Sequence, residues 1–98
     1  MLVICPGSFD PVHNGHLEII ARAASLFDEG VVGVAHNHSK KYLFSLQERV
    51  RLVTDSLAEL GIEGVGVEII PTGVLLAEYA AQRGASALVK GLRSGTDY

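Results

Sequence analysis

The chain alternates between short apolar runs and longer segments in which apolar residues recur every three or four positions. Short apolar runs are typical of buried strands, and the three-to-four spacing is typical of amphipathic helices. We therefore expect four strands, at Leu2–Ile4, Val31–Ala35, Val65–Ile70 and Ala87–Val89. We expect three helices between them, one from His16 to about Asp28, one between Ser45 and Gly61, and one between Leu75 and Gly84.

The segment before Gly61 carries the clearest helix signals. Ser45 and Glu48 form the S-x-x-E pattern of a capping box, and Gly61 is a natural C-terminal glycine. The apolar residues of this helix share one face and are expected to be buried: Leu46, Val50, Val53, Leu57 and Leu60. Arg49 and Arg51 are expected to lie on its solvated face.

Strands that alternate with helices indicate a parallel sheet covered by helices. Right-handed crossovers then give an α/β doubly wound sheet with helices on both faces, and a chain of 98 residues is expected to form a single domain, 1–98. Ligands of such folds bind beyond the carboxyl ends of the strands. Three loops are expected to converge there, at Pro6–Gly15, His36–Phe44 and Lys90–Thr96.

Composition argues against some partners and favours one cellular setting for this fold. The net charge of −3 argues against a general nucleic-acid coat, so we expect no nucleic-acid partner. The single cysteine, Cys5, cannot form an internal disulfide, which favours a reducing, cytoplasmic setting. No run is long enough to span a bilayer and no signal-peptide pattern follows Met1, so we expect no membrane partner.

The three loops concentrate the unusual polar chemistry. Glycines in the first loop would let the backbone approach a phosphate, and the start of the following helix offers free N–H groups. Lys40 in the second loop, and Lys90 and Arg93 in the third, would add positive charge to an otherwise acidic chain. This combination predicts a pocket for a polyphosphate.

His13 and His16 stand three residues apart near the start of the first helix. A metal site would need a further ligand, and no Cys, Asp or Glu stands at a suitable spacing, so we expect no metal held by protein side chains. We expect His16 to donate a hydrogen bond to a phosphate oxygen, and His13 to act as a turn or capping residue. The residue types leave the protonation state of His16 open.

Several other polar and aromatic residues have structural interpretations. Asp10 is expected to cap or brace the first loop. Cys5 and Tyr79 are expected in the core, and His36 and His38 are expected to be solvated loop residues.

The stretch "GSFDPVHNGH" resembles the H-x-G-H motif of the nucleotidyltransferase superfamily, with His13, Asn14, Gly15 and His16 in its four places. Three further segments, "NHSKKYLFSLQERV", "GVLLAEYA" and "ALVKGLRSGTDY", make the whole chain similar to the phosphopantetheine adenylyltransferase family. The first motif is shared by several related families, whereas the four segments together, in this order, are specific.

The resemblance implies reversible adenylyl transfer from ATP to 4′-phosphopantetheine, which gives dephospho-coenzyme A and pyrophosphate. This is the penultimate step of coenzyme A biosynthesis. Mg²⁺ is implied on the polyphosphate of ATP, with no dedicated protein ligand. The family also implies a homo-oligomer, which is a hexamer, and coenzyme A as a feedback ligand.

The resemblance also assigns roles to individual residues. His16 and Lys40 are implied as the catalytic residues, His16 on the α-phosphate of ATP and Lys40 on the attacking phosphate. Phosphopantetheine is expected to contact Ser8, Lys40, Leu76 and Lys90. ATP is expected to contact Ser8, Phe9, His16, Gly91, Leu92 and Arg93.

The family's chain continues beyond the position of Tyr98, with an acidic residue that contacts adenosine and a later serine-rich segment. The resemblance therefore covers the N-terminal part of the family's chain. Within that part, the phosphopantetheine side of the site is expected to be complete and the nucleotide side about half present.

Two other functions remain open at this point. A nicotinate or nicotinamide mononucleotide adenylyltransferase has the opening motif G-x-F-D-P-x-H-x-G-H, which His13 suits well. A non-catalytic fragment would bind a ligand without turnover, and pyrophosphate release would separate it from an enzyme. A dinucleotide-binding domain is disfavoured because no G-x-G-x-x-G follows the first strand.

Overall fold

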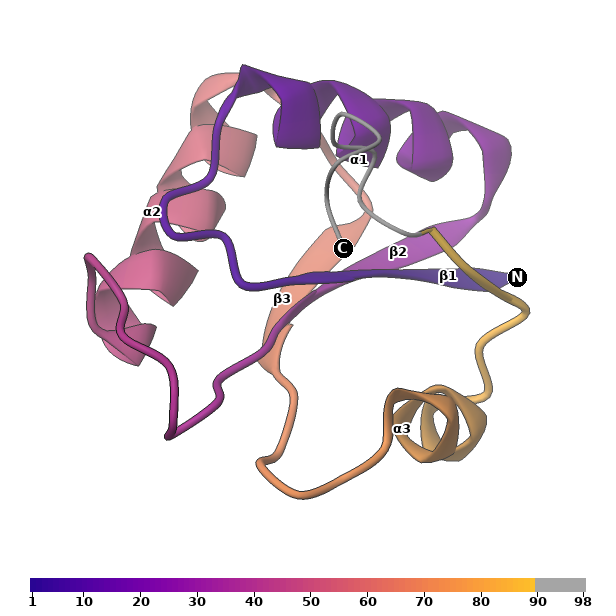
Figure 1. Ribbon diagram of the computed structural model, residues 1–98. Helices are drawn as coiled ribbons and strands as arrows, with labels where there is room; N and C mark the ends of the chain where they lie inside the picture. The colour runs from indigo at the N-terminus through magenta and orange to yellow at the C-terminus, as the bar shows by residue number, and fades with distance from the viewer. Residues whose placement is uncertain (90–98) are drawn as a thin grey trace.

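The computed structural model in Figure 1 describes residues 1–89. Its strands and helices are β1 (Leu2–Gly7), α1 (Asn14–Leu26), β2 (Glu29–Val34), α2 (Leu46–Glu59), β3 (Val65–Ile69), α3 (Leu76–Arg83) and β4 (Ala87–Leu88). The strands pair in parallel and form one sheet in the order β3-β2-β1-β4. The expected parallel α/β fold is confirmed. Within this described part, no helix is long and apolar enough to cross a membrane.

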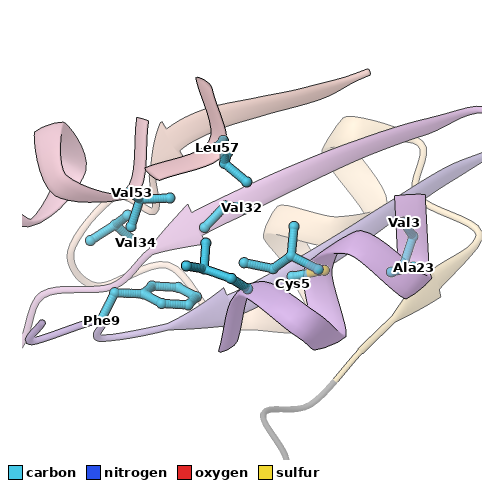
Figure 2. Packing of buried hydrophobic residues seen from close by; sticks show 10 residues of the cluster. Val3, Cys5, Phe9, Ala23, Val32, Val34, Val53 and Leu57 are labelled. Atoms are coloured by element: carbon cyan, nitrogen blue, oxygen red, sulfur yellow. The ribbon is translucent and has the colours of Figure 1, made fainter. Parts of the chain in front are cut away.

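Helices cover both faces of the sheet, as expected for a doubly wound fold. On one face α1 and α2 bury the larger core, part of which is shown in Figure 2. Its buried residues are Val3, Cys5, Phe9, Leu17, Ile20, Ala23, Val32, Val34, Val53 and Leu57. On the opposite face, α3 packs its Tyr79 with Ile4, Val31 and Ile70. Since β2 and β4 lie on opposite sides of β1, the strand order reverses between β1 and β4.

Strand β1 is longer than expected, because its pairing with β2 continues as far as Gly7 opposite Val34. Proline usually ends a central strand because it lacks an N–H donor. At Pro6 the missing donor faces the β4 side, like the carbonyl of Ile4 that accepts from Val89. The described pairing of β4 with β1 ends at Ile4, so Pro6 interrupts no ladder bond among residues 1–89.

Two expectations for α2 are wrong. Leu60 is 59% exposed, because the helix ends at Glu59 and Leu60 is its C-cap. Arg49, expected on the solvated face, is 0% exposed and shares the buried side of the helix with Val53. The capping box of Ser45 and Glu48 is confirmed, and Arg51 is exposed as expected.

Tyr79 also connects α3 to the sheet through polar contacts. Its hydroxyl donates to Oε1 of Glu68 on β3 at 2.5 Å, and Arg83 pairs with Oε2 of the same carboxylate at 2.8 Å. Burial, followed by the adjacent Glu68, raises the pKa of Tyr79 to about 12. The hydroxyl therefore stays protonated and keeps donating at neutral pH, which holds α3 against β3.

Close packing between the sheet and Ile70 gives a stability prediction for Gly33. A Cβ at Gly33 would lie 2.8 Å from Cδ1 and 2.9 Å from Cγ1 of the buried Ile70. We expect Gly33→Ala to lower the free energy of unfolding by about 1–3 kcal/mol, the usual effect of overpacking a core. Urea denaturation followed by circular dichroism measures this change.

Gly66→Ala on β3 is the matched control, because a Cβ at Gly66 would meet no atom of a non-adjacent residue within 4 Å. It should change the free energy of unfolding by no more than about 0.5 kcal/mol. Ile70→Val in the Gly33→Ala background should recover part of the loss. Equal stabilities of the two alanine variants would contradict this account of the packing.

Candidate functional site

A cavity of about 530 Å³ opens at the carboxyl ends of β1 and β4, beside the N-terminus of α1. Its walls come from the segment around the first loop, from Lys40 and Tyr42 in the second loop, and from Val89 after β4. This is where the strand order reverses, the position at which open parallel sheets bind ligands. The first two loops therefore converge as expected.

The structure brings several expected site residues to this cavity: Ser8, Phe9, His16 and Lys40. Leu76 lies in a second, more apolar hollow of about 360 Å³, which is also lined by Ala35, Ile70 and Val74. Pro6, Gly7 and Ser8 form a wall common to both hollows. Lys90, Gly91, Leu92 and Arg93 lie outside the described residues, so their roles stay predictions.

The two histidines organise the turn before α1. His13 is the N-cap, and its Nδ1 accepts from the amides of Gly15 at 3.1 Å and His16 at 3.3 Å. The His13 amide donates in return to Nδ1 of His16 at 3.1 Å, and the two rings stack with centroids 3.6 Å apart. The expected capping role of His13 is confirmed.

This arrangement has two consequences for phosphate binding. Because Nδ1 of His16 accepts a hydrogen bond, the neutral ring carries its proton on Nε2, which is then the donor nitrogen of the ring. The amides of Gly15 and His16, expected to be free for a phosphate, are instead bonded to the His13 side chain. The helix start therefore contributes its dipole, and these two amides are already satisfied.

Phe9 anchors the turn that carries the site. Its side chain is 5% exposed within the main core (Figure 2), and its ring meets His16 edge-on at a centroid distance of 4.9 Å. The backbone of Phe9 has a φ of 49°, in the left-handed region that residues other than glycine seldom adopt. Burial of the ring offsets the cost of this conformation. The core contacts of the Phe9 ring therefore hold the turn between Ser8 and Asp10 in place.

Asp10 joins the first loop to the second. Its Oδ2 accepts from the amide of Leu43 at 2.7 Å, and its Oδ1 accepts from the amide of Phe44 at 2.8 Å. The expected bracing role is confirmed, but the loop that Asp10 holds is the one that carries Lys40. Both carboxylate oxygens are therefore engaged in structure.

Arg49 is the residue at this site that the sequence pattern missed. Its buried Nη1 donates to the carbonyl oxygens of Ser8 at 2.9 Å and Ala35 at 3.0 Å. Its Nη2 lies 2.6 Å from Nδ1 of His36, and the guanidinium lies 3.9 Å from the ring centroid of Tyr42. The sequence does contain a signal for this burial. Arg49 stands three residues after Leu46 and four before Val53, which places it in the apolar stripe of the helix.

His36 is half-buried, which corrects the expectation of a solvated loop residue. Since a guanidinium can only donate, the Nδ1 of His36 must accept from Arg49, and this requires an unprotonated Nδ1. Burial, the positive charge of Arg49 and the neighbouring His38 lower the pKa of His36 from its ordinary value of 6.5. His38 is exposed, as expected.

Cys5 lines the cavity but belongs to the core, as expected. It is 5% exposed, and burial raises the pKa of its thiol to about 11. At neutral pH the sulfur is therefore protonated, and a thiol is a far weaker nucleophile than a thiolate.

A metal ion held at the cavity would need several side-chain ligands close together. Among residues 1–89, no three His, Cys, Asp or Glu side chains lie close enough together to hold a metal ion. Asp10 is the one acidic residue among the described residues that line the cavity, and the amides of Leu43 and Phe44 occupy both of its oxygens.

The hydrogen bond between Arg49 and His36 gives a pH prediction. A folded-state pKa below 6.5 means that the unfolded chain binds a proton more readily. The stabilising contribution of His36 is therefore complete above about pH 6.5 and is lost as the pH falls below that value. We expect His36→Gln, which cannot titrate, to show a shallower fall in unfolding free energy between about pH 7 and 5.

Urea denaturation at several pH values measures both slopes, and their difference isolates His36 from the other three histidines of the chain. His38→Gln is the control, because it removes only the smallest of the three causes that lower the pKa of His36 and should keep most of the slope of the unmodified chain. Parallel curves for the unmodified chain and His36→Gln would refute the assignment.

Comparisons with known proteins agree with this geometry. Residues 4–98 match the model of the cytidylyltransferase-like family. Over 95 residues the chain is 59% identical to a phosphopantetheine adenylyltransferase of Pseudarthrobacter chlorophenolicus and 58% identical to one of Renibacterium salmoninarum. These alignments cover 97% of this chain but 55% and 58% of the relatives, so the chain spans little more than half their length. The resemblance drawn from the motifs is confirmed.

A solved structure shares the fold. The lipopolysaccharide core biosynthesis protein from Thermoplasma volcanium superposes with a TM-score of 0.71 and covers 90% of this chain and 71% of its own. Its 22% sequence identity limits the likeness to the fold. The family match, in contrast, extends over the cavity residues Ser8, His16 and Lys40 and over nearly all of the sequence. The chain belongs to the cytidylyltransferase-like family.

Proposed function

We propose that the chain forms the phosphopantetheine-binding part of a phosphopantetheine adenylyltransferase. The reaction transfers the adenylyl group of ATP reversibly to the phosphate of 4′-phosphopantetheine and gives dephospho-coenzyme A and pyrophosphate, the penultimate step of coenzyme A biosynthesis. The observation that carries the proposal is the pair of hollows that meet at Ser8. One is the more polar and is lined by Lys40, and the other is mostly apolar, which suits a phosphate at the end of a long uncharged arm.

The polar cavity supplies the groups that a phosphate needs. Lys40 and His16 both line it, and the start of α1 directs its positive dipole end toward it. We assign Lys40 to the attacking phosphate and the Nε2–H of His16 to the α-phosphate of ATP. Ser8, on the common wall, would bond the attacking phosphate where the two substrates meet.

The apolar hollow suits the pantetheine arm. Leu76 lines it at the first position of α3, together with Val74 and Ile70. An uncharged chain gains from burial against such side chains, whereas a second phosphate would not. The two hollows therefore orient the substrate with its phosphate toward Ser8.

The chemistry requires little covalent work from the protein. The phosphate of phosphopantetheine attacks the α-phosphorus of ATP, the bond to the pyrophosphate oxygen breaks, and pyrophosphate leaves. Holding the two phosphates in line and neutralising their charge supply the rate enhancement. The protonated thiol of Cys5 is consistent with a route without a protein nucleophile.

The remaining assignments concern ATP and the setting of the protein. We assign ATP contacts to Phe9, Gly91, Leu92 and Arg93, and a phosphopantetheine contact to Lys90. Mg²⁺ would enter with the polyphosphate, since the oxygens of Asp10 are already bonded to amides. We further propose that the protein acts in the cytoplasm as a homo-oligomer and that coenzyme A binds as a feedback ligand.

Calorimetric titration of the chain with 4′-phosphopantetheine tests the proposal, with nicotinate mononucleotide as the competing ligand. We expect selective binding of phosphopantetheine, because the two hollows match its phosphate and its uncharged arm. Preference for the mononucleotide would favour the related mononucleotide enzyme. Binding of neither ligand would refute the proposed site in this chain.

Replacement of His16 tests its catalytic assignment. Because its Nε2–H would act on charge that develops in the transition state, we expect His16→Ala to lower kcat by about 10²- to 10³-fold with little change in KM. Pyrophosphate release measures both constants. His38→Ala, which removes an exposed histidine outside the cavity lining, is the control and should leave them unchanged.

Two outcomes would count against this assignment. An equal loss of binding and turnover in His16→Ala would remove the transition-state role. Phosphopantetheine binding by the unmodified chain without pyrophosphate release would identify it as a non-catalytic binder.

A further inference from the structure

The guanidinium of Arg49 carries a buried charge for which the described structure contains no carboxylate partner. The side chain is 0% exposed, and none of the ion pairs found among residues 1–89 involves it. Its Nε also lacks a hydrogen-bond partner within the same range. A buried charge without a counter-ion destabilises a fold unless its hydrogen bonds and surroundings compensate. The groups that Arg49 contacts must therefore compensate for the burial of its charge.

Two of those groups are the carbonyls that follow the ends of adjacent strands. Ser8 follows β1, which ends at Gly7, and Ala35 follows β2, which ends at Val34. The last bond between the strands runs from the Ala35 amide to the Gly7 carbonyl at 2.8 Å. Beyond it, one nitrogen of Arg49 donates to both the Ser8 and Ala35 carbonyls. The side chain thus continues the connection between the strands after their own ladder has stopped.

The face of the same guanidinium contacts the loop that carries Lys40. It lies 3.9 Å from the ring centroid of Tyr42, and Nζ of Lys40 lies 5.7 Å from the same centroid. The Tyr42 hydroxyl accepts from the amide of Asn37 at 2.8 Å, which closes this loop on itself. Arg49 therefore contacts the Ser8 turn with its edge and the Lys40 loop with its face.

Arg49 lines neither hollow, so it reaches the substrate only through other residues. We propose that Arg49 is a positioning residue that holds the Ser8 turn and the Lys40 loop at a fixed separation around the substrate phosphate. The inference rests on the proposed function for the identity of that substrate. A planar guanidinium can bond two carbonyls with one edge and stack on a ring at the same time, whereas a lysine ammonium cannot.

Arg49→Lys tests this proposal, with Arg51→Lys as the matched control. The control makes the same chemical change two residues away on α2, at a side chain that is 83% exposed. The amide ¹⁵N shifts of Phe9 and His36 give a readout without any ligand, because these amides follow the two bonded carbonyls directly. Calorimetry with 4′-phosphopantetheine gives the second readout.

We expect Arg49→Lys to shift both amides and to weaken phosphopantetheine binding at least tenfold, while cooperative unfolding is retained. Arg51→Lys should change neither readout. Unchanged amide shifts in Arg49→Lys, or an unchanged affinity beside shifted amides, would overturn the proposal. If the unmodified chain binds no phosphopantetheine, the proposed function fails, and the amide shifts alone decide whether Arg49 holds the two carbonyls.

A second variant keeps the test decisive if Arg49→Lys does not fold. Tyr42→Leu removes the ring beneath the guanidinium and leaves both carbonyl bonds available. It should weaken phosphopantetheine binding with the fold intact, whereas Tyr42→Phe, which keeps the ring, should lose less. Equal affinities for Tyr42→Leu and the unmodified chain would overturn the role of Arg49 in placing the Lys40 loop.

Discussion

The parallel register of β1 and β2 determines where the candidate site can form. Gly7 lies opposite Val34, so both strands end at the same level and their loops leave the sheet as neighbours. The carbonyls of Ser8 and Ala35 lie beyond the last described bond of the β1–β2 ladder, and buried backbone carbonyls need a donor. Arg49 supplies that donor from α2, which fastens the helix, the strand ends and both loops together. The position of Ser8, and with it the wall between the two hollows, depends on this connection.

The same connection shapes the electrostatics of the cavity. The chain as a whole has a net charge of −3, yet the described residues around the cavity place Lys40 and the start of α1 beside it and Arg49 behind it. Among the described residues that line the cavity, Asp10 is the one carboxylate, and both of its oxygens accept from amides. The described partners of the Arg49 edge are neutral acceptors. A charge in a poorly hydrated setting acts over a longer distance than one in water. The anionic substrate that we propose would therefore supply compensation that the described side chains around Arg49 do not.

Much of the fold follows from local patterns in the sequence. Apolar runs and amphipathic spacing locate the strands and helices, and the Ser45–Glu48 pair locates the start of α2, because these signals act within one element. The convergence of the first two loops follows from topology alone. Other features depend on neighbours that no local pattern contains. The extension of β1 through Pro6 depends on its pairing with β2, and the occupied amides of α1 depend on the rotamer of His13.

Arg49 shows how the sequence could have been interpreted further. Arginine side chains are solvated on most helices. This general tendency predicts that Arg49 lies on the exposed face of α2, and that prediction is wrong. Its spacing from Leu46 and Val53 places it in the buried stripe, where a charged side chain must find hydrogen-bond acceptors. In a parallel α/β fold, the unpaired carbonyls available to the first turns of a helix are those at the carboxyl ends of the strands it covers. An arginine near the start of such a stripe therefore points to the ends of those strands, which is the edge where ligands bind.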